Sequence, residues 1–115
     1  MPGISVHVVD TTRGMPAAGM RIEIFVLAPA RRRIAEGVLA PSGALDHAIA
    51  RERLAAGTYE VVFHAGDFFK SAGVAQADPP FLDEVPFRFQ IADPGQHYHL
   101  PMKMTPWGFS VYRGS

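Results

Sequence analysis

Five histidines are the first residues of this 115-residue chain that could do chemistry: His7, His47, His64, His97 and His99. Imidazole changes its charge near neutral pH, so each of them could serve as a general acid or base. His97 and His99 are two positions apart, which places both on one face of any strand that contains them. The same spacing separates Ser5 from His7.

The pair formed by His97 and His99 would also suit a metal ion. A third histidine from a neighbouring strand would complete a set of three imidazole ligands. The chain has no cysteine, which excludes disulfides, thiolate nucleophiles and zinc–thiolate sites. Spacing alone does not choose between acid–base chemistry, metal binding and histidines that are merely solvated or packed in a core.

Alternating apolar residues predict the strands that would position these histidines. In residues 4–10, Ile4, Val6 and Val8 point one way, and Ser5 and His7 point the other way. Further strands are predicted over residues 20–27, 34–39, 59–64, 84–91, 96–104 and 107–115, with a short strand followed by a loop over 45–54. Seven or eight short strands with regular turn signals indicate an all-β protein, a β-sandwich.

Other segments predict the connections between these strands. Asp67 offers an N-cap to residues 68–72, which we interpret as the only helix, ended at Gly73. Residues 74–83 contain two adjacent prolines and are predicted as loop. Because proline cannot donate a hydrogen bond to a neighbouring strand, Pro86 predicts that residues 84–91 form an edge strand or that its nitrogen lies on an unpaired side.

Composition narrows the function classes. Eleven basic and eleven acidic residues balance, so no overall charge favours nucleic acid or an anionic membrane. The one basic cluster, Arg31 to Arg33, is expected at a solvated hairpin tip. No apolar run approaches the ~18 residues of a membrane span, and residues 1–4 do not resemble a signal peptide. We expect one domain over residues 1–115 and a cytoplasmic location.

Two segments at opposite ends of the sequence carry a family resemblance. Residues 5–19, SVHVVDTTRGMPAAG, resemble a signature of the transthyretin-like family, and residues 112–115, YRGS, resemble the closing tetrapeptide of its enzymatic branch, the 5-hydroxyisourate hydrolases. Shorter matches lie at residues 56–60, 63–69, 87–89 and 98–101. The resemblance implies a transthyretin-like (prealbumin-like) Greek-key sandwich and a homotetramer, a dimer of dimers with a channel between the dimers.

The resemblance also implies a site and a reaction. His7, His99 and Ser115 match the family's catalytic residues, and Tyr112 and Arg113 are the expected substrate-binding residues, although Arg113 could instead fix the terminal strand. The implied reaction is hydrolytic opening of the 5-hydroxyisourate ring in purine degradation, without a metal ion or organic cofactor. A positioned water, a base near neutral pKa and donors to the oxyanion would suffice.

Ala44 departs from the family pattern, because family members usually carry an arginine after the glycine of this turn. A guanidinium fork that could hold a polar ring edge is therefore missing. Arg51 or Arg53 could supply the contact from the following loop. Alternatively, the substrate is an N-methylated hydroxyisourate from methylxanthine breakdown, whose ring edge is less polar.

Two other function classes compete with the hydrolase. A non-catalytic binding protein, like transthyretin itself, would hold a small ligand in the same channel. A structural β-sandwich module of a larger complex is the other. Transthyretins lack the histidines and the tetrapeptide YRGS, whereas this chain has both, so we favour hydrolysis.

Overall fold

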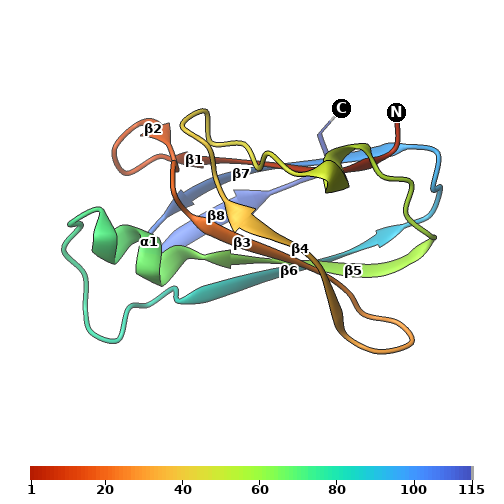
Figure 1. The fold of residues 1–115 in the computed structure, drawn as a ribbon. Coiled ribbons are helices and arrows are strands. Elements are labelled where there is room, and N and C mark those ends of the chain that lie inside the picture. Colours follow the sequence, from red (N-terminus) through yellow and green to blue (C-terminus); the bar gives the residue numbers. More distant parts are fainter. Residues whose placement is uncertain (115) are drawn as a thin grey trace.

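Two four-stranded sheets packed face to face form the framework of the protein (Figure 1). The computed structural model describes residues 1–114. Its elements follow in the order β1 (Gly3–Asp10), β2 (Met15–Pro16), β3 (Arg21–Val26), β4 (Arg32–Val38), the 3₁₀ helix η1 (Ala48–Arg51), β5 (Gly57–His64), α1 (Ala65–Ser71), β6 (Glu84–Ile91), β7 (His97–Thr105) and β8 (Gly108–Val111). The predicted all-β sandwich is confirmed.

The first sheet has the order β2-β1-β7-β8, and the second has the order β4-β3-β5-β6. All neighbouring strands are antiparallel except β1 and β7, which run parallel in the centre of the first sheet. In that pair Ser5 lies opposite His99, and His7 lies opposite Pro101. The register therefore brings together residues that are more than ninety positions apart in sequence.

The core lies between the sheets and is built by strict alternation. On β1 the side chains of Ile4, Val6 and Val8 are buried, while Ser5 and His7 remain partly exposed on the other face, as predicted. The rest of the core comes mainly from facing strands, with buried Ile22, Ile24, Val61, Phe63, Leu100, Met102 and Met104. Because side chains alternate along a strand, one face of β1 and β7 packs in the core, and the other face carries polar side chains.

Residues 45–54 form no strand, and the prediction of a short strand there was wrong. Nδ1 of His47 accepts a hydrogen bond from the backbone N–H of Ile49 at 2.9 Å and so caps the 3₁₀ helix η1. The buried side chain of Ile49 then secures this turn against the core. A second helical element therefore joins α1, which was expected to be alone.

The helix α1 also begins earlier than predicted, at Ala65, so Asp67 lies in its first turn and is not its N-cap. An acidic residue in the first turn still complements the positive end of the helix dipole. The predicted end is close: Ala72 is the C-cap, and Gly73 follows with a φ of 76°, a left-handed conformation that favours glycine. Within the described residues, no helix is long and apolar enough to cross a membrane.

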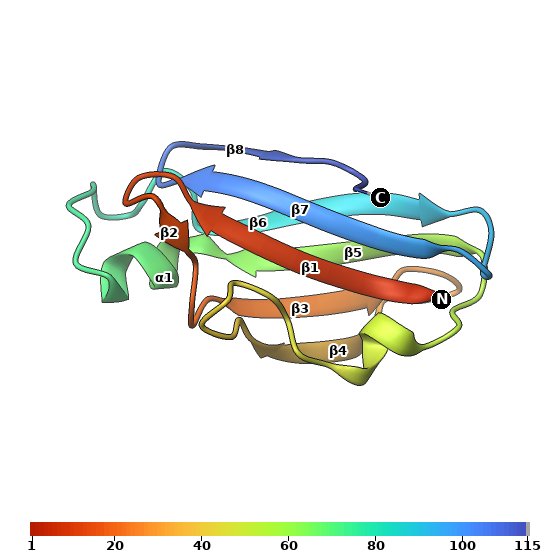
Figure 2. The ribbon, with the colours of Figure 1, turned by 90° about the horizontal axis from the view of Figure 1, so that it is seen from above.

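The strands β6 and β8 end the two sheets on the same side of the sandwich, as the view from above shows (Figure 2). Pro86 lies on β6, so the predicted edge strand is confirmed. The strand β8 ends at Val111, earlier than the predicted run to residue 115. Near this edge the side chains of Trp107, Phe109 and Tyr112 are 56%, 45% and 57% exposed.

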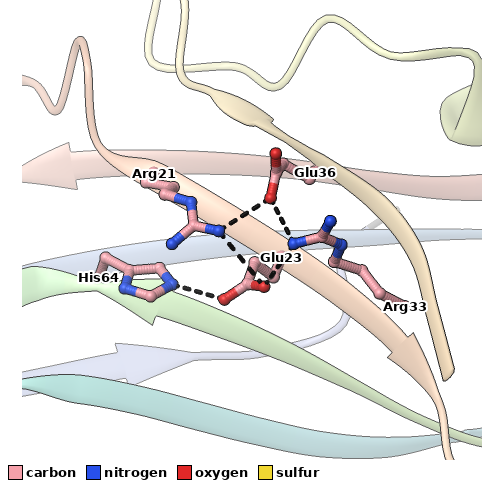
Figure 3. A network of polar contacts seen from close by, with 5 residues as sticks. All are labelled: Arg21, Glu23, Arg33, Glu36 and His64. Carbon is pink, nitrogen blue, oxygen red and sulfur yellow. Dashed lines mark hydrogen bonds and ion pairs between the residues drawn. The ribbon is translucent and has the colours of Figure 1, made fainter. Parts of the chain in front are cut away.

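A network of charged side chains covers part of the outer face of the second sheet (Figure 3). Glu23 on β3 is at its centre: one carboxylate oxygen lies 2.7 Å from Nε2 of His64, and the other lies 3.1 Å from Arg33. Arg21 bonds Glu36 at 2.8 Å. The hydrogen bond to His64, and then the one from Arg33, hold the pKa of Glu23 below its usual value. In the cluster Arg31 to Arg33, Arg33 joins this network and Arg31 lies 3.8 Å from Glu60, and all three residues are exposed, as expected.

Candidate functional site

Ser5, His7, His97 and His99 lie on the outer face of the first sheet, on its two central strands. All four are partly buried. Two strands in parallel register, each with polar residues at alternate positions, are enough to gather them. The structure thus places the two histidines expected to be catalytic, His7 and His99, on the same face of the sheet. Ser5 and His97 lie on that face as well, and Ser5 contacts both His97 and His99.

His7 is held by the loop that precedes η1. Its Nε2 donates a hydrogen bond to the carbonyl of Ser42 at 2.8 Å. The loop comes this close because residue 43 is glycine: its φ is +86°, and a Cβ there would lie 2.7 Å from the carbonyl oxygen of Val8. Since a carbonyl only accepts hydrogen bonds, a neutral His7 carries its proton on Nε2 and has a lone pair on Nδ1.

His99 forms a hydrogen bond with Ser5 on the neighbouring strand β1, and the Oγ of Ser5 lies 2.7 Å from Nδ1 of the ring. Burial lowers the pKa of His99 from its ordinary value of 6.5, and the neighbouring His97 and His7 lower it further. The ring is therefore neutral at physiological pH. A neutral imidazole at this position is ready to accept a proton, which is what a general base requires.

The segment after β8 folds back over His99. The backbone N–H of Gly114 donates to the carbonyl of His99 at 2.7 Å, and the N–H of Tyr112 reaches the carbonyl of Pro101 at 3.4 Å. A Cβ on Gly114 would lie 2.9 Å from Cδ2 of His99, so this approach requires glycine. Ser115, the third expected catalytic residue, lies outside the described residues and stays a prediction.

Arg113 has structural contacts in this fold. Its guanidinium donates to Oε1 of Gln96 at 2.9 Å and to the carbonyl of His97 at 3.1 Å. It also lies over the ring of Tyr98, 4.1 Å from the ring centroid. These contacts fix the segment 112–114 against β7, which is the alternative role considered for Arg113; a role of Arg113 or Tyr112 in binding substrate stays a prediction.

Ala44 lies beside His7, because the two residues form an isolated antiparallel bridge. Its methyl group offers no hydrogen-bond donor where the family pattern has a guanidinium. Arg51 belongs to η1, and the guanidinium of Arg53 lies near Gly95. Among residues 1–114, neither arginine forms a hydrogen bond with His7 or His99.

Two sets of residues bear on metal binding. Nε2 of His97 and Nδ1 of His99 each lie 2.7 Å from Oγ of Ser5, so these two nitrogens form hydrogen bonds with the serine and do not face a shared metal position. In the described part of the chain, one group brings three potential ligand atoms within 4.8 Å: Glu23, His64 and Glu84 on the second sheet. Arg21 and Arg33 lie against Glu23 there, which makes this group part of the ion-pair network.

Ser5 and His97 are the members of this site whose roles the sequence did not reveal. The repeated spacing of two, in Ser5–His7 and in His97–His99, was the available signal. It could not be used without knowing that β1 and β7 are parallel neighbours.

The sequence matches a model of one protein family over residues 4–114, and that model is described as the HIUase/Transthyretin family. The chain belongs to the HIUase/Transthyretin family. Its curated relatives include the 5-hydroxyisourate hydrolase of Deinococcus radiodurans, which is 49% identical over 99% of this chain and 97% of that protein. The 5-hydroxyisourate hydrolase 2 of Rhizobium meliloti is 46% identical over 97% of this chain and 95% of that protein.

Solved structures of the HIUase/Transthyretin fold agree with the architecture described above. The 5-hydroxyisourate hydrolase of Klebsiella pneumoniae has a TM-score of 0.83, with 28% identity over the full length of both chains. The crystal structure of an (S)-allantoin synthase gives a TM-score of 0.89 and 39% identity, covering 98% of this chain and 43% of that one. The expected family and transthyretin-like fold are thus confirmed.

Proposed function

We propose that this protein is a 5-hydroxyisourate hydrolase, which opens the ring of its substrate during purine degradation. The observation that carries the proposal is the placement of His7 and His99 on one sheet face, next to the glycine of the YRGS segment. The relatives that share nearly the full length of the chain have this activity in their names. The fold by itself would not distinguish an enzyme from a binding protein.

The reaction needs a base, a nucleophile and support for developing charge. A water molecule attacks the acyl carbon while Nε2 of His99 takes a proton from it, and a tetrahedral oxyanion forms. The ring C–N bond then breaks, and the protonated His99 returns the proton to the leaving nitrogen. The lone pair on Nδ1 of His7 accepts a hydrogen bond from the water or from a ring N–H.

Ser115, Tyr112 and Arg113 complete this proposal. The Ser115 side chain would hold the water or the substrate, and Tyr112 would contact the substrate. Arg113 would keep the segment in place through its contacts with Gln96 and the His97 carbonyl. No step of the proposed mechanism requires a metal ion or an organic cofactor.

A homotetramer, a dimer of dimers, is part of the proposal. Two edge strands, β6 and β8, lie on one side of the sandwich, and exposed aromatic side chains lie near β8. Unpaired edges of this kind are suited to extending both sheets across a twofold axis. Light scattering should return about four protomer masses. A fully active monomer would remove the channel between dimers from the mechanism.

The cytoplasmic location stays a prediction.

The activity is tested by generating 5-hydroxyisourate enzymatically and following its decay with and without the protein. An N-methylated analogue is measured in parallel, since Ala44 leaves the substrate's methylation open. We expect the purified protein to accelerate the decay of one or both. Saturable binding of the substrate without any acceleration would favour the transthyretin-like binding protein instead.

A further inference from the structure

Ser5 stands between two histidine rings, and its hydroxyl touches both. Its Oγ lies 2.7 Å from Nε2 of His97 and 2.7 Å from Nδ1 of His99. On the other side of His97, Nδ1 lies 3.3 Å from the backbone carbonyl of Pro2. The four groups therefore form one chain of hydrogen bonds that begins at a carbonyl and ends at the ring expected to act as base.

When His97 is neutral, the carbonyl at one end fixes the direction of every hydrogen bond in this chain. A carbonyl oxygen can only accept, so Nδ1 of His97 must donate to Pro2. A neutral His97 then has its lone pair on Nε2, which can only accept from the hydroxyl of Ser5. Because that hydroxyl has a single proton, the Ser5 oxygen must in turn accept from Nδ1 of His99.

These hydrogen bonds determine the protonation of Nε2 of His99, the ring nitrogen that does not contact Ser5. With the proton held on Nδ1, the neutral ring has its lone pair on Nε2, and no side-chain or backbone group among residues 1–114 occupies that nitrogen. A base needs this lone pair to face the reactants. The chain of bonds thus selects the tautomer of His99 that can accept a proton from water at Nε2.

We propose that Ser5 and His97 are positioning residues that hold His99 in the Nδ1–H tautomer, so that Nε2 serves as the general base. The inference rests on the proposed function for its catalytic meaning. The tautomer of His99 is nevertheless a property of the free protein. A serine and a histidine perform the task that a buried carboxylate performs in serine proteases.

His97 acts in this scheme only as an acceptor for the Ser5 hydroxyl. Glutamine can place its carbonyl oxygen near the position of a histidine Nε2, whereas leucine has a similar bulk but no acceptor. His97→Gln should therefore recover most of the rate, and His97→Leu should not. Without an acceptor at residue 97, the hydroxyl of Ser5 is free to rotate and to donate to Nδ1 of His99. This would favour the Nε2–H tautomer of His99, in which Nε2 cannot accept a proton.

The first test uses NMR of protein with isotopically labelled histidine, because ring-nitrogen shifts report which nitrogen carries the proton. The spectra are recorded above pH 6.5, where His99 is neutral, and His99→Asn assigns its signals. We expect protonated Nδ1 and bare Nε2 in the wild type. In Ser5→Ala the populations should move toward protonated Nε2. A wild type with the proton on Nε2, or unchanged signals in Ser5→Ala, would overturn the inference.

The second test is kinetic and uses wild type, Ser5→Ala, His97→Leu and His97→Gln. We expect kcat to fall by about 10- to 100-fold in Ser5→Ala and in His97→Leu, which is part of the usual contribution of general base catalysis. KM should change much less. Equal losses in His97→Gln and His97→Leu would exclude an acceptor role. If the wild type showed no turnover, the proposed function would fail, while the NMR result would still decide the tautomer.

Discussion

The backbone of Gly114 is bonded to the backbone of His99 at 2.7 Å, and the glycine faces the imidazole so closely that a Cβ would lie 2.9 Å from its Cδ2. This contact joins the segment 112–114 to the centre of the first sheet. Any change that pushes the segment away also disturbs the ring. The close contact therefore couples the YRGS segment to the candidate base.

Gly114→Ala should lower kcat/KM for 5-hydroxyisourate by about 10-fold or more, because a displaced base loses much of its contribution to the rate. Thermal unfolding should change little, since the residue lies outside the core. Gly108→Ala is the matched control, because a Cβ there meets nothing within 4 Å. Equal kinetics in the two variants would show that the contact does not matter for turnover.

His7→Asn and His99→Asn should each lower kcat by roughly 100-fold or more, the usual scale for loss of an acid–base group. His47→Asn should have little effect, since its role is to cap η1 and asparagine is also a good N-cap. His64→Asn is a second control on the opposite sheet. Steady-state kinetics on freshly generated substrate measure all four. Activity that survives in His99→Asn would move the base to another residue.

The pH dependence of kcat/KM should show an acidic limb below pH 6.5. His99 must be neutral to act as base, and its pKa is lowered by burial, by His97 and by His7. Activity is therefore complete above the ordinary histidine value and is lost as the pH falls through the lowered pKa. His97→Gln removes one of the causes, so its limb should move to higher pH. A limb that starts well above pH 6.5 in the wild type would contradict the assignment.

Glu23→Gln should destabilise the protein without affecting turnover. The carboxylate accepts hydrogen bonds from His64 and Arg33, and bonds to a charged group contribute about 1.5–3 kcal/mol each, less where solvent reaches them. Because its folded pKa is lowered, Glu23 contributes stability above its ordinary pKa of 4.5 and loses that contribution as the pH falls through the lowered value.

Urea unfolding of Glu23→Gln and wild type at several pH values measures this difference, which should shrink below about pH 4.5. Glu52→Gln is the control, because Glu52 is exposed and forms no ion pair in the described residues. A difference between wild type and Glu23→Gln that is constant down to the lowest pH would show that shape, and not charge, is responsible.

Alternation of apolar residues was enough to predict most of the strands and to put His7 on the polar face of β1. It could not reveal that β1 and β7 are parallel neighbours, because strand pairing depends on contacts across the whole sequence. The link between Ser5 and His99 was hidden for this reason. The short strand predicted at the start of residues 45–54 is absent, and the segment contains the 3₁₀ helix η1, which His47 caps.

The family resemblance supplied what patterns could not: which two of five histidines to choose. The geometry now separates His47 and His64 from the three histidines on the outer face of the first sheet, His7, His97 and His99. His47 caps a helix and His64 bonds a carboxylate, so both have structural partners. Ser115 falls outside the described residues, and its role is still carried by the resemblance alone.

Ala44→Arg addresses the substrate directly, because residue 44 lies beside His7 and lacks the guanidinium of the family pattern. A charged bidentate contact contributes about 1.5–3 kcal/mol, a factor of roughly 10 to 150. The new arginine should therefore raise kcat/KM for 5-hydroxyisourate. It should lower kcat/KM for the N-methylated analogue, since a methyl group would leave the guanidinium desolvated without a partner.

The measurement is the ratio of the two specificity constants in wild type, Ala44→Arg and Ala44→Met. Methionine is the control for added bulk, because it fills similar space without a donor. The ratio should shift toward 5-hydroxyisourate in Ala44→Arg alone. If the wild type already prefers 5-hydroxyisourate and Ala44→Arg leaves the ratio unchanged, then another residue, such as Arg51, supplies the contact, and methylation of the substrate does not explain Ala44.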